Sequence, residues 1–273
     1  MKYETLVLDI DGTLLSSDLK ISDNTVKIIE KLHSSGINIV FCSGRMFKSA
    51  VNFIKYNFSF SPPVISYNGG MIHESLTHDP LVCHSIDVDT SVSLIKFMRS
   101  RNCHCQIYLN DDLITENENS EITHYARHAG VDYTVVSNMT SVIEKYNSGP
   151  VKILAIGENE FLNEIAVESK KIFSEKLNIF KSYSNYLDFI PLSTNKGIAL
   201  KELADSMNFN LKKTIMIGDG ENDSYAFDYV KTSVAMGNAD EFLKSKADYV
   251  TETNDSEGAF LAIRDFFSDI LSQ

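Results

Sequence analysis

Short apolar runs alternate with segments whose apolar residues recur at helical spacing, and this order predicts strands followed by helices. Residues 4–10 (E-T-L-V-L-D-I) form the kind of run that is buried on both faces of a parallel sheet. Residues 22–35 have apolar side chains at helical spacing, with Ser22 as the expected N-cap and Gly36 as the stop. The alternation continues with an expected strand at 37–42, a helix at 46–57 and a strand at 64–67. This βαβαβ order predicts a parallel sheet with right-handed crossovers.

The pattern changes between about residues 81 and 187, where short strands and helices are interleaved. The turn at Asn110-Asp111-Asp112 indicates antiparallel pairing in this stretch. The expected strands are 105–109, 113–116, 151–156 and 178–182, and the clearest helices are 90–101 and 158–176. The first pattern then returns with a helix at 195–207, a strand at 214–217, a helix after Asn222, a strand at 233–236 and a closing helix at 256–271. We therefore expect an α/β fold: a Rossmann-like, doubly wound parallel-sheet core from residues 1–80 and 188–273, with an α+β domain inserted at residues 81–187.

Composition narrows the class of protein. A chain of 273 residues with 43% hydrophobic residues can bury a large core and favours two domains. Its 25 basic against 37 acidic residues give a net charge of −12, which repels phosphate backbones and argues against nucleic-acid binding as the main task. No run of about 18 apolar residues predicts a membrane span. The N-terminal residues 1–4 lead straight into a strand without a signal peptide, so we expect a cytoplasmic protein.

The cysteines do not suggest a disulfide framework, because they are few and widely scattered in a long chain. They are Cys42, Cys83, Cys103 and Cys105. The cluster Cys103-His104-Cys105 has the look of a partial metal site, but no second ligand pair accompanies it, which favours a structural role.

Two carboxylates stand at the end of the first expected strand, in Asp9-Ile10-Asp11-Gly12-Thr13-Leu14. Ligands of open α/β sheets bind at the carboxyl ends of the strands, so residues at several strand ends can meet in space. Two like charges in one place are unfavourable unless a cation neutralises them or one carboxylate is protonated. A metal site would supply the cation, and an acid–base site would use the proton. The alternative is a solvated Asp-Gly turn.

Two further stretches suit an anion. Ser43-Gly44-Arg45 offers a hydroxyl and a backbone N–H at a helix start, although a simple helix cap has the same sequence. Lys196 begins another helix, where a cation opposes the helix dipole and indicates a bound anion, an exposed lysine being the alternative.

Residues 218–223 (G-D-G-E-N-D) place three acids and an amide at the end of an apolar strand. Oxygen ligands at this density suit Mg²⁺ better than Zn²⁺. The alternative is a flexible acidic loop, which the two glycines and the apolar strand in front make less favourable.

Together these stretches resemble the haloacid dehalogenase (HAD) superfamily, and within it the Cof-type phosphatases with a large α/β cap. The family's D-x-D-G-T-L is matched by residues 9–14, its Ser or Thr by Ser43, its lysine by Lys196 and its G-D-x-x-N-D by residues 218–223. The resemblance extends to residues 68–70, 235–239 and 247–251. One departure is Ala226, which stands where the family often has Met, at a packing position.

The resemblance implies a Mg²⁺-dependent hydrolase of phosphoric monoesters that works through an aspartyl phosphate, with the inserted domain as the cap that sets substrate specificity. Asp9 would be the nucleophile and Asp11 the general acid and base. The implied ligands of Mg²⁺ are Asp9, Asp11 through its backbone carbonyl, Asp219 and Asp223. The implied phosphate-binding groups are the Ile10 amide, Ser43, the Gly44 N–H, Lys196 and Asn222.

The expected partner is a small phosphorylated metabolite such as a sugar phosphate, with no nucleic acid and no membrane, and the expected assembly is a monomer or weak homo-oligomer. Two alternatives are a phosphomutase of the same fold, which would need a second phosphate site in the cap, and a non-catalytic metabolite-binding or regulatory protein. The presence of Asp11 favours a phosphatase or phosphomutase over a dehalogenase. The intact Asp9, Asp11, Lys196 and Asp219 argue against the non-catalytic reading.

Overall fold

The computed structural model describes residues 3–76 and 79–272. The chain divides into two compact units, the first formed by Met1–Gly44, Ala50–Val82 and Asn195–Gln273 and the second by Arg45–Ser49 and Cys83–Thr194. The expected domain boundaries at residues 81 and 187, and the role of the insert as a cap, stay predictions. The expectation about a signal peptide rests partly on Met1 and Lys2, which lie outside the described residues.

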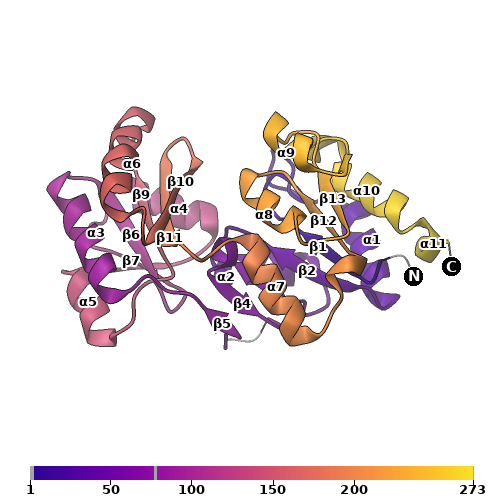
Figure 1. The fold of residues 1–273 in the computed structure, drawn as a ribbon, viewed down its shortest axis with the longest axis horizontal. Coiled ribbons are helices and arrows are strands. Elements are labelled where there is room, and N and C mark those ends of the chain that lie inside the picture. Colours follow the sequence, from indigo (N-terminus) through magenta and orange to yellow (C-terminus); the bar gives the residue numbers. More distant parts are fainter. Residues whose placement is uncertain (1–2, 77–78, 273) are drawn as a thin grey trace. The chain divides into compact units, whose positions relative to one another are not determined.

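The first unit is built on an eight-stranded sheet (Figure 1), whose edge strand β5 (Val82–Cys83) ends at the boundary with the second unit. In spatial order its strands are β14 (Tyr249–Val250), β13 (Thr232–Ala235), β12 (Thr214–Gly218), β1 (Thr5–Leu8), β2 (Asn38–Cys42), β3 (Val64–Ser66), β4 (Met71–His73) and β5. Pairing is parallel from β14 to β3, whereas β4 runs antiparallel to β3. In the centre, Leu8 lies opposite both Ile217 and Phe41, so β12, β1 and β2 end within one residue of the same level.

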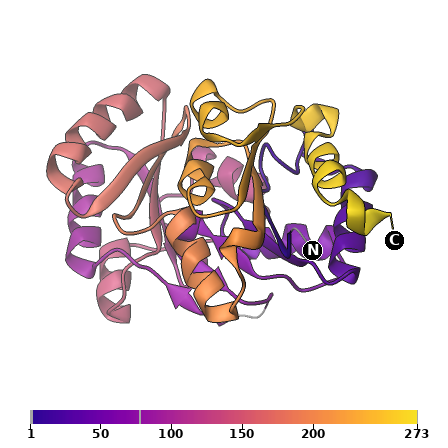
Figure 2. The same ribbon diagram turned by 45° about the vertical axis from the view of Figure 1, so that its right-hand side comes forward.

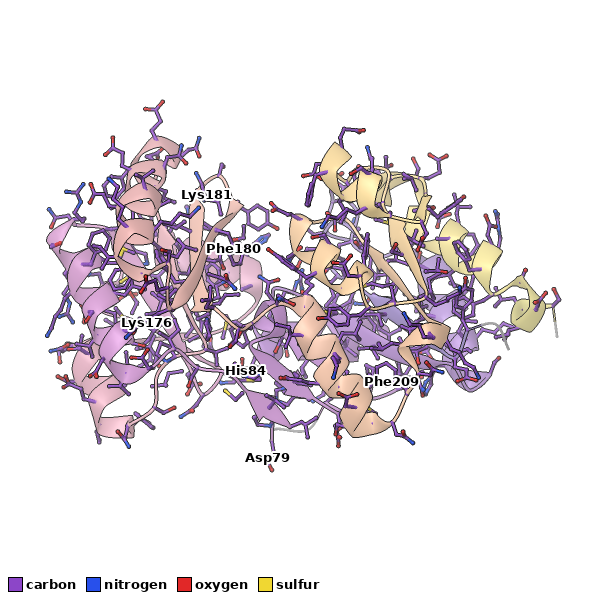
Figure 3. All side chains as sticks on the ribbon, in the orientation of Figure 1. Asp79, His84, Lys176, Phe180, Lys181 and Phe209 are labelled. Carbon is purple, nitrogen blue, oxygen red and sulfur yellow. The ribbon has the colours of Figure 1, made fainter. Side chains whose placement is uncertain are left out.

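Helices cover both faces of this sheet, which confirms the doubly wound α/β prediction. One face carries α7 (Lys196–Met207), α8 (Ser224–Phe227) and α9 (Glu241–Lys246), whose apolar residues share a core with Val7, Val40 and Met216. Phe209, labelled in Figure 3 beside α7, packs against the same core. Phe41 points to the other face, where its ring centroid lies 6.4 Å from that of Phe53 in α2 (Phe47–Asn57).

Two helix boundaries of this unit have identifiable causes, one in local capping and one in packing. α1 (Asp23–Ser34) begins as expected, because the Ser22 hydroxyl accepts the Thr25 N–H at 3.1 Å. The expectation of one closing helix over 256–271 is wrong: the chain forms α10 (Gly258–Phe266) and α11 (Ser268–Leu271), separated at Phe267. The Phe267 side chain is buried and its ring centroid lies 5.7 Å from that of Tyr3, so packing holds the residue at the break.

The second unit contains a six-stranded sheet (Figures 1 and 2). Its order is β10 (Leu177–Tyr183), β11 (Tyr186–Pro191), β9 (Lys152–Ile156), β6 (His104–Leu109), β7 (Asp112–Thr115) and β8 (Tyr133–Val135). Pairing is antiparallel except between β7 and β8. The expected hairpin turn is present, since Leu109 pairs with Asp112 and both Asn110 and Asp111 have positive φ, as a tight hairpin turn requires.

The helices α3 (Val88–Ser100), α5 (Met139–Tyr146) and α6 (Asn159–Phe173) share the hydrophobic core of this sheet, and α4 (Ser120–Ala129) joins β7 to β8. At the edge strand β10, the ammonium of Lys181, labelled in Figure 3, donates to the Asn163 side-chain oxygen of α6 at 3.0 Å. Cys103 and Cys105 are free thiols within the core, where burial raises their pKa values to about 11 and about 12. These two cysteines therefore pack as small apolar side chains.

Every helix of the described part of the chain is too short or too polar to cross a membrane.

Candidate active site

The candidate site lies where the three central strands of the first unit end. Asp9 follows β1, Ser43 follows β2 and Asp219 follows β12. The ladder continues into these residues, because the Asp9 N–H donates to the Ile217 carbonyl at 3.1 Å. The sequence stretches singled out above are thus brought to one edge of a parallel sheet, which is where ligands of such sheets bind.

Lys196 joins two of these stretches. Its ammonium donates to Asp9 Oδ1 and to Asp223 Oδ1, each at 2.7 Å, and only 1% of its side chain is exposed. Burial alone would lower the pKa of Lys196, but Asp223 and Asp9 outweigh burial and raise it above its usual range. Lys196 stands in the first turn of α7, capped by Asn195, whose side chain accepts the Ile198 N–H at 2.9 Å. The cation at this helix start is therefore compensated by two carboxylates.

Asp223 organises the loop after β12. While Oδ1 accepts from Lys196, Oδ2 accepts the N–H groups of Asp219 and Gly220 at 3.0 and 2.9 Å. Gly218 is required beneath it, because a Cβ there would lie 2.4 Å from the Asp223 Cγ. Asp223 is fully buried, and these bonds make it the anchor of both Lys196 and Asp219.

Three carboxylates crowd together here. Asp9, Asp219 and Asp223 each offer an oxygen, and these oxygens lie within 4.8 Å of one another. Burial raises the pKa of Asp9 well above its usual range, and the nearby Asp223 and Asp219 add to the rise while Lys196 opposes it. Burial and Asp223 likewise raise the pKa of Asp219 to about 6. Three carboxylates against one ammonium leave an excess of negative charge, and an all-oxygen donor set with that excess fits a hard divalent cation.

Asp11 lies outside this acidic triad and is half-buried. The metal contact expected of Asp11 is through its backbone carbonyl, and the triad concerns side-chain carboxylates only. That contact therefore stays a prediction. Ile10 has a fully buried side chain, and its carbonyl accepts the N–H groups of Leu14 and Leu15 at 3.0 Å. These bonds close the chain after β1 into a compact turn, so only backbone groups of Ile10 can face a ligand.

The turn after Asp11 approaches the loop after β12 closely. Gly12 has φ +74°, and a Cβ on it would lie 2.1 Å from Asp219 Oδ2. Thr13 donates its hydroxyl to Asp219 Oδ1 at 2.8 Å. Glycine is therefore needed here for both conformation and space, and Thr13 orients the Asp219 carboxylate.

The anion-binding candidates come next to one another through a residue to which the sequence assigned no role. The Asn222 side-chain N–H donates to Asn68 Oδ1 at 2.7 Å, and the Asn68 N–H donates to the Ser43 carbonyl at 3.1 Å. A Cβ on Gly44 would lie 3.0 Å from Asn68 Oδ1. Asn68 thus links the stretch after β2 to the loop after β12.

Asn68 and Thr13 were missed as site residues, and one of them carried a signal in the sequence. Asn followed by two glycines after a strand marks a turn with positive φ, a conformation in which Asn is the best-tolerated side chain after Gly. Thr13 belongs to the D-x-D-G-T-L stretch, but its role was not readable there, because only the fold brings it to Asp219. Ala226 is fully buried in the core beside α7, which confirms that it is a packing position.

Comparison with known proteins agrees with the geometry. The sequence model of the haloacid dehalogenase-like hydrolases matches residues 6–263. Phosphatase YwpJ of Bacillus subtilis is 27% identical over 277 residues, covering 93% of this chain and 96% of that protein. The 5-amino-6-(5-phospho-D-ribitylamino)uracil phosphatase YitU of the same organism is 24% identical over 271 residues, covering 96% and 97%.

Among solved structures, TM0651 from Thermotoga maritima superposes with a TM-score of 0.88 at 35% identity and covers 96% of this chain and 97% of that one. The family match spans most of the chain and includes each of the stretches that meet at the sheet edge. The chain belongs to the haloacid dehalogenase-like hydrolases of the Cof type, and it is a phosphatase of phosphoric monoesters.

Proposed function

We propose that this phosphatase hydrolyses small phosphorylated metabolites, sugar phosphates among them, with Mg²⁺ and through a phosphoryl group carried on Asp9. The observation that carries the proposal is the cluster of the Asp9, Asp219 and Asp223 carboxylates, two of which, Asp9 and Asp223, share one buried ammonium. Three carboxylates and one ammonium leave an excess of negative charge, and a bound cation would balance that excess. Mg²⁺ held by Asp9, Asp219 and the Asp11 carbonyl, with Asp223 at or behind it, would neutralise the charge of the phosphoryl group.

The chain's own residues divide the reaction into two displacements. In the first, a carboxylate oxygen of Asp9 forms a bond to phosphorus while the bond from phosphorus to the ester oxygen breaks, and Asp11 donates a proton to the leaving alcohol. In the second, Asp11 takes a proton from water, the water oxygen bonds to phosphorus and the acyl phosphate bond breaks. Asp9 and inorganic phosphate are then released, and the sum is ester plus water giving alcohol plus phosphate.

The surrounding groups hold the phosphoryl group in line with Asp9. Lys196 already binds Asp9 Oδ1, which opposes the rise in the pKa of that carboxyl group and fixes its orientation. Ser43, Asn222 and the N–H groups of Ile10 and Gly44 are the donors we assign to the phosphoryl oxygens. Fixed donors around a transferring phosphoryl group supply most of the catalysis in this kind of reaction, because they need no reorganisation.

We assign choice of substrate to the inserted domain. Alternate residues of its sheet that do not enter the hydrophobic core form a polar cluster, in which the buried Lys152 pairs with Asp188 and lies 5.4 Å from the Tyr108 ring centroid. Ser182 donates its hydroxyl to Asp188 as well. Hydroxyl, amide and aromatic groups of this kind suit polyols and sugars, and the name of YitU indicates a phosphorylated ribityl compound as its substrate.

The same cluster weakens the phosphomutase alternative. A second phosphate would need unpaired cations in the inserted domain, but Lys152 is committed to Asp188 and Lys170 and Lys171 are exposed on α6. The net charge of −12 supports small metabolites rather than nucleic acids as partners. We further propose a cytoplasmic monomer or weak homo-oligomer.

The nucleophile is tested with two variants and one activated ester. Asp9→Asn should abolish hydrolysis of para-nitrophenyl phosphate, since an amide cannot form the acyl phosphate. Asp11→Asn should release one equivalent of nitrophenol in a burst and then stall, because this leaving group needs no proton but the attacking water does. Mass spectrometry should find a phosphoryl group on the Asp9 peptide in the stalled variant.

Asp205→Asn is the control, since Asp205 is exposed on α7 and pairs only with Lys201 among the contacts described there. It should keep wild-type turnover. Normal turnover by Asp9→Asn, or a stalled Asp11→Asn enzyme labelled on another residue, would show that the nucleophile is assigned wrongly.

A further inference from the structure

The turn that follows β3 has an unfavourable backbone. Tyr67, Asn68 and Gly69 have φ values of +54°, +56° and +102°, and the first two are not glycines. Successive non-glycine residues in this region cost free energy and persist only where the surroundings hold them. Tyr67 and Asn68 are both buried, so contacts with the surrounding protein hold this conformation.

The turn at residues 67–69 contacts three of the stretches that build the site. On one side the Asn68 N–H donates to the Ser43 carbonyl at 3.1 Å. On the other, a Cβ on Gly69 would lie 2.4 Å from the Asn195 carbonyl oxygen, directly before Lys196. The turn therefore touches the segments that carry Ser43 and Lys196, and its conformation sets the distance between them.

The Asn68 side chain completes the third connection. Its Oδ1 accepts one N–H of the Asn222 amide at 2.7 Å, and Asn68 is 5% exposed. A primary amide has two N–H groups, so this bond uses one and aims the other. A Cβ on Gly44 would lie 3.0 Å from Asn68 Oδ1, so the oxygen that holds the Asn222 amide lies close to the Gly44 backbone.

We propose that Asn68 is a positioning residue for phosphate: it holds the Asn222 amide so that its second N–H points at a phosphoryl oxygen. This inference rests on the proposed function in one respect, the assignment of Asn222 to the phosphoryl group. The strained turn is the means, because in this conformation the Asn68 backbone N–H reaches the Ser43 carbonyl while its side chain reaches Asn222. A purely structural turn would have no need of the side-chain oxygen.

The test is a double-mutant cycle in the full-length protein. Asn68→Gly removes the acceptor while suiting the positive φ, so the variant should fold with an unchanged or higher Tm. It should lower kcat/KM for para-nitrophenyl phosphate by about 10- to 100-fold, the usual effect of losing a hydrogen bond to a charged group. Asn222→Ala should cost a similar factor, and the double variant should be no more than about 3-fold worse than Asn222→Ala, since coupled residues are not additive.

Asn208→Gly is the matched control. Asn208 has φ +55° and ψ +44° at the C-cap of α7, so the same substitution relieves the same backbone conformation away from the site. It should leave kcat/KM unchanged. Equal losses in Asn208→Gly and Asn68→Gly would overturn the inference, and so would multiplicative losses in the double variant.

A binding measurement separates this inference from the proposed function. Calorimetric titration of Mg²⁺-loaded protein with inorganic phosphate should show a roughly 10-fold weaker Kd for Asn68→Gly than for wild type and for Asn208→Gly. If the wild type binds phosphate but hydrolyses no ester, the proposed function fails while the Kd comparison still decides the role of Asn68. Equal Kd values, or a wild type that binds no phosphate, would refute the role of Asn68.

Discussion

Replacing Lys196 by Met tests whether its ammonium stabilises the two buried carboxylates that it contacts. Met is close to Lys in length and removes only the ammonium, leaving Asp9 and Asp223 buried without the cation that both contact at 2.7 Å. Removing one partner of a buried ion pair costs about 3–5 kcal/mol, because the remaining charge has neither water nor a counter-ion. For a domain of this size each kcal/mol lowers Tm by about 2–4 °C, so the metal-free variant should melt roughly 6–20 °C below the metal-free wild type.

The assay is thermal unfolding followed by circular dichroism, in chelator and again in excess Mg²⁺. Because the variant has one positive charge fewer beside three carboxylates, Mg²⁺ should raise its Tm by more than it raises that of the wild type. A cation that binds only the folded state adds about 2.7 kcal/mol at one hundred times its Kd.

Lys201→Met is the matched control on the same helix. Lys201 pairs with Asp205 at 2.7 Å, but both side chains are more than half exposed, so the loss of this pair should leave Tm unchanged. If Lys196→Met has the same Tm in chelator as Lys201→Met, the reasoning is refuted, since the stability of the two buried carboxylates would then not depend on the ammonium.

Two further predictions concern the metal and the turn that approaches it. Gly12→Ala should abolish turnover and weaken Mg²⁺ binding measured by calorimetry, because its Cβ would lie 2.1 Å from Asp219 Oδ2; Gly36→Ala, with φ +86° and open space around it, should leave both unchanged. If Gly12→Ala binds Mg²⁺ as the wild type does, Asp219 is not the ligand we propose. Removing metal with chelator should silence hydrolysis, and Mg²⁺ should restore it better than Ca²⁺, which takes more ligands at longer distances. Full activity in excess chelator would contradict any role for the metal.

Local sequence was sufficient where one short segment sets its own environment. The apolar runs that became β1, β2 and β12 were readable because a strand covered on both faces needs no alternation. The start of α1 was readable because its N-cap bond spans only from Ser22 to Thr25. The hairpin between β6 and β7 was equally local.

Elements that depend on distant packing were missed. Neither β8 nor β11 was expected, and neither α4 nor α5. β8 is short and partly exposed, so its strand state comes from pairing with β7 rather than from its own pattern. The closing helix was predicted as one piece because nothing in its sequence marks Phe267, which the ring of Tyr3 holds from the other end of the chain.

For the site, the sequence by itself determined which residue types stand at the strand ends, and it selected Asp9, Lys196, Asp219 and Asp223 before any geometry was known. Tertiary structure alone decided that Lys196 bonds two carboxylates, one of them 187 positions away, and that Asn68 meets Asn222 across 154 positions. Hydropathy and capping patterns act over a few residues, whereas these bonds form only after the parallel sheet has brought its strand ends together. Short stretches of sequence therefore determine the chemical groups of the site, whereas the order of the strands in the sheet determines which of these groups contact one another.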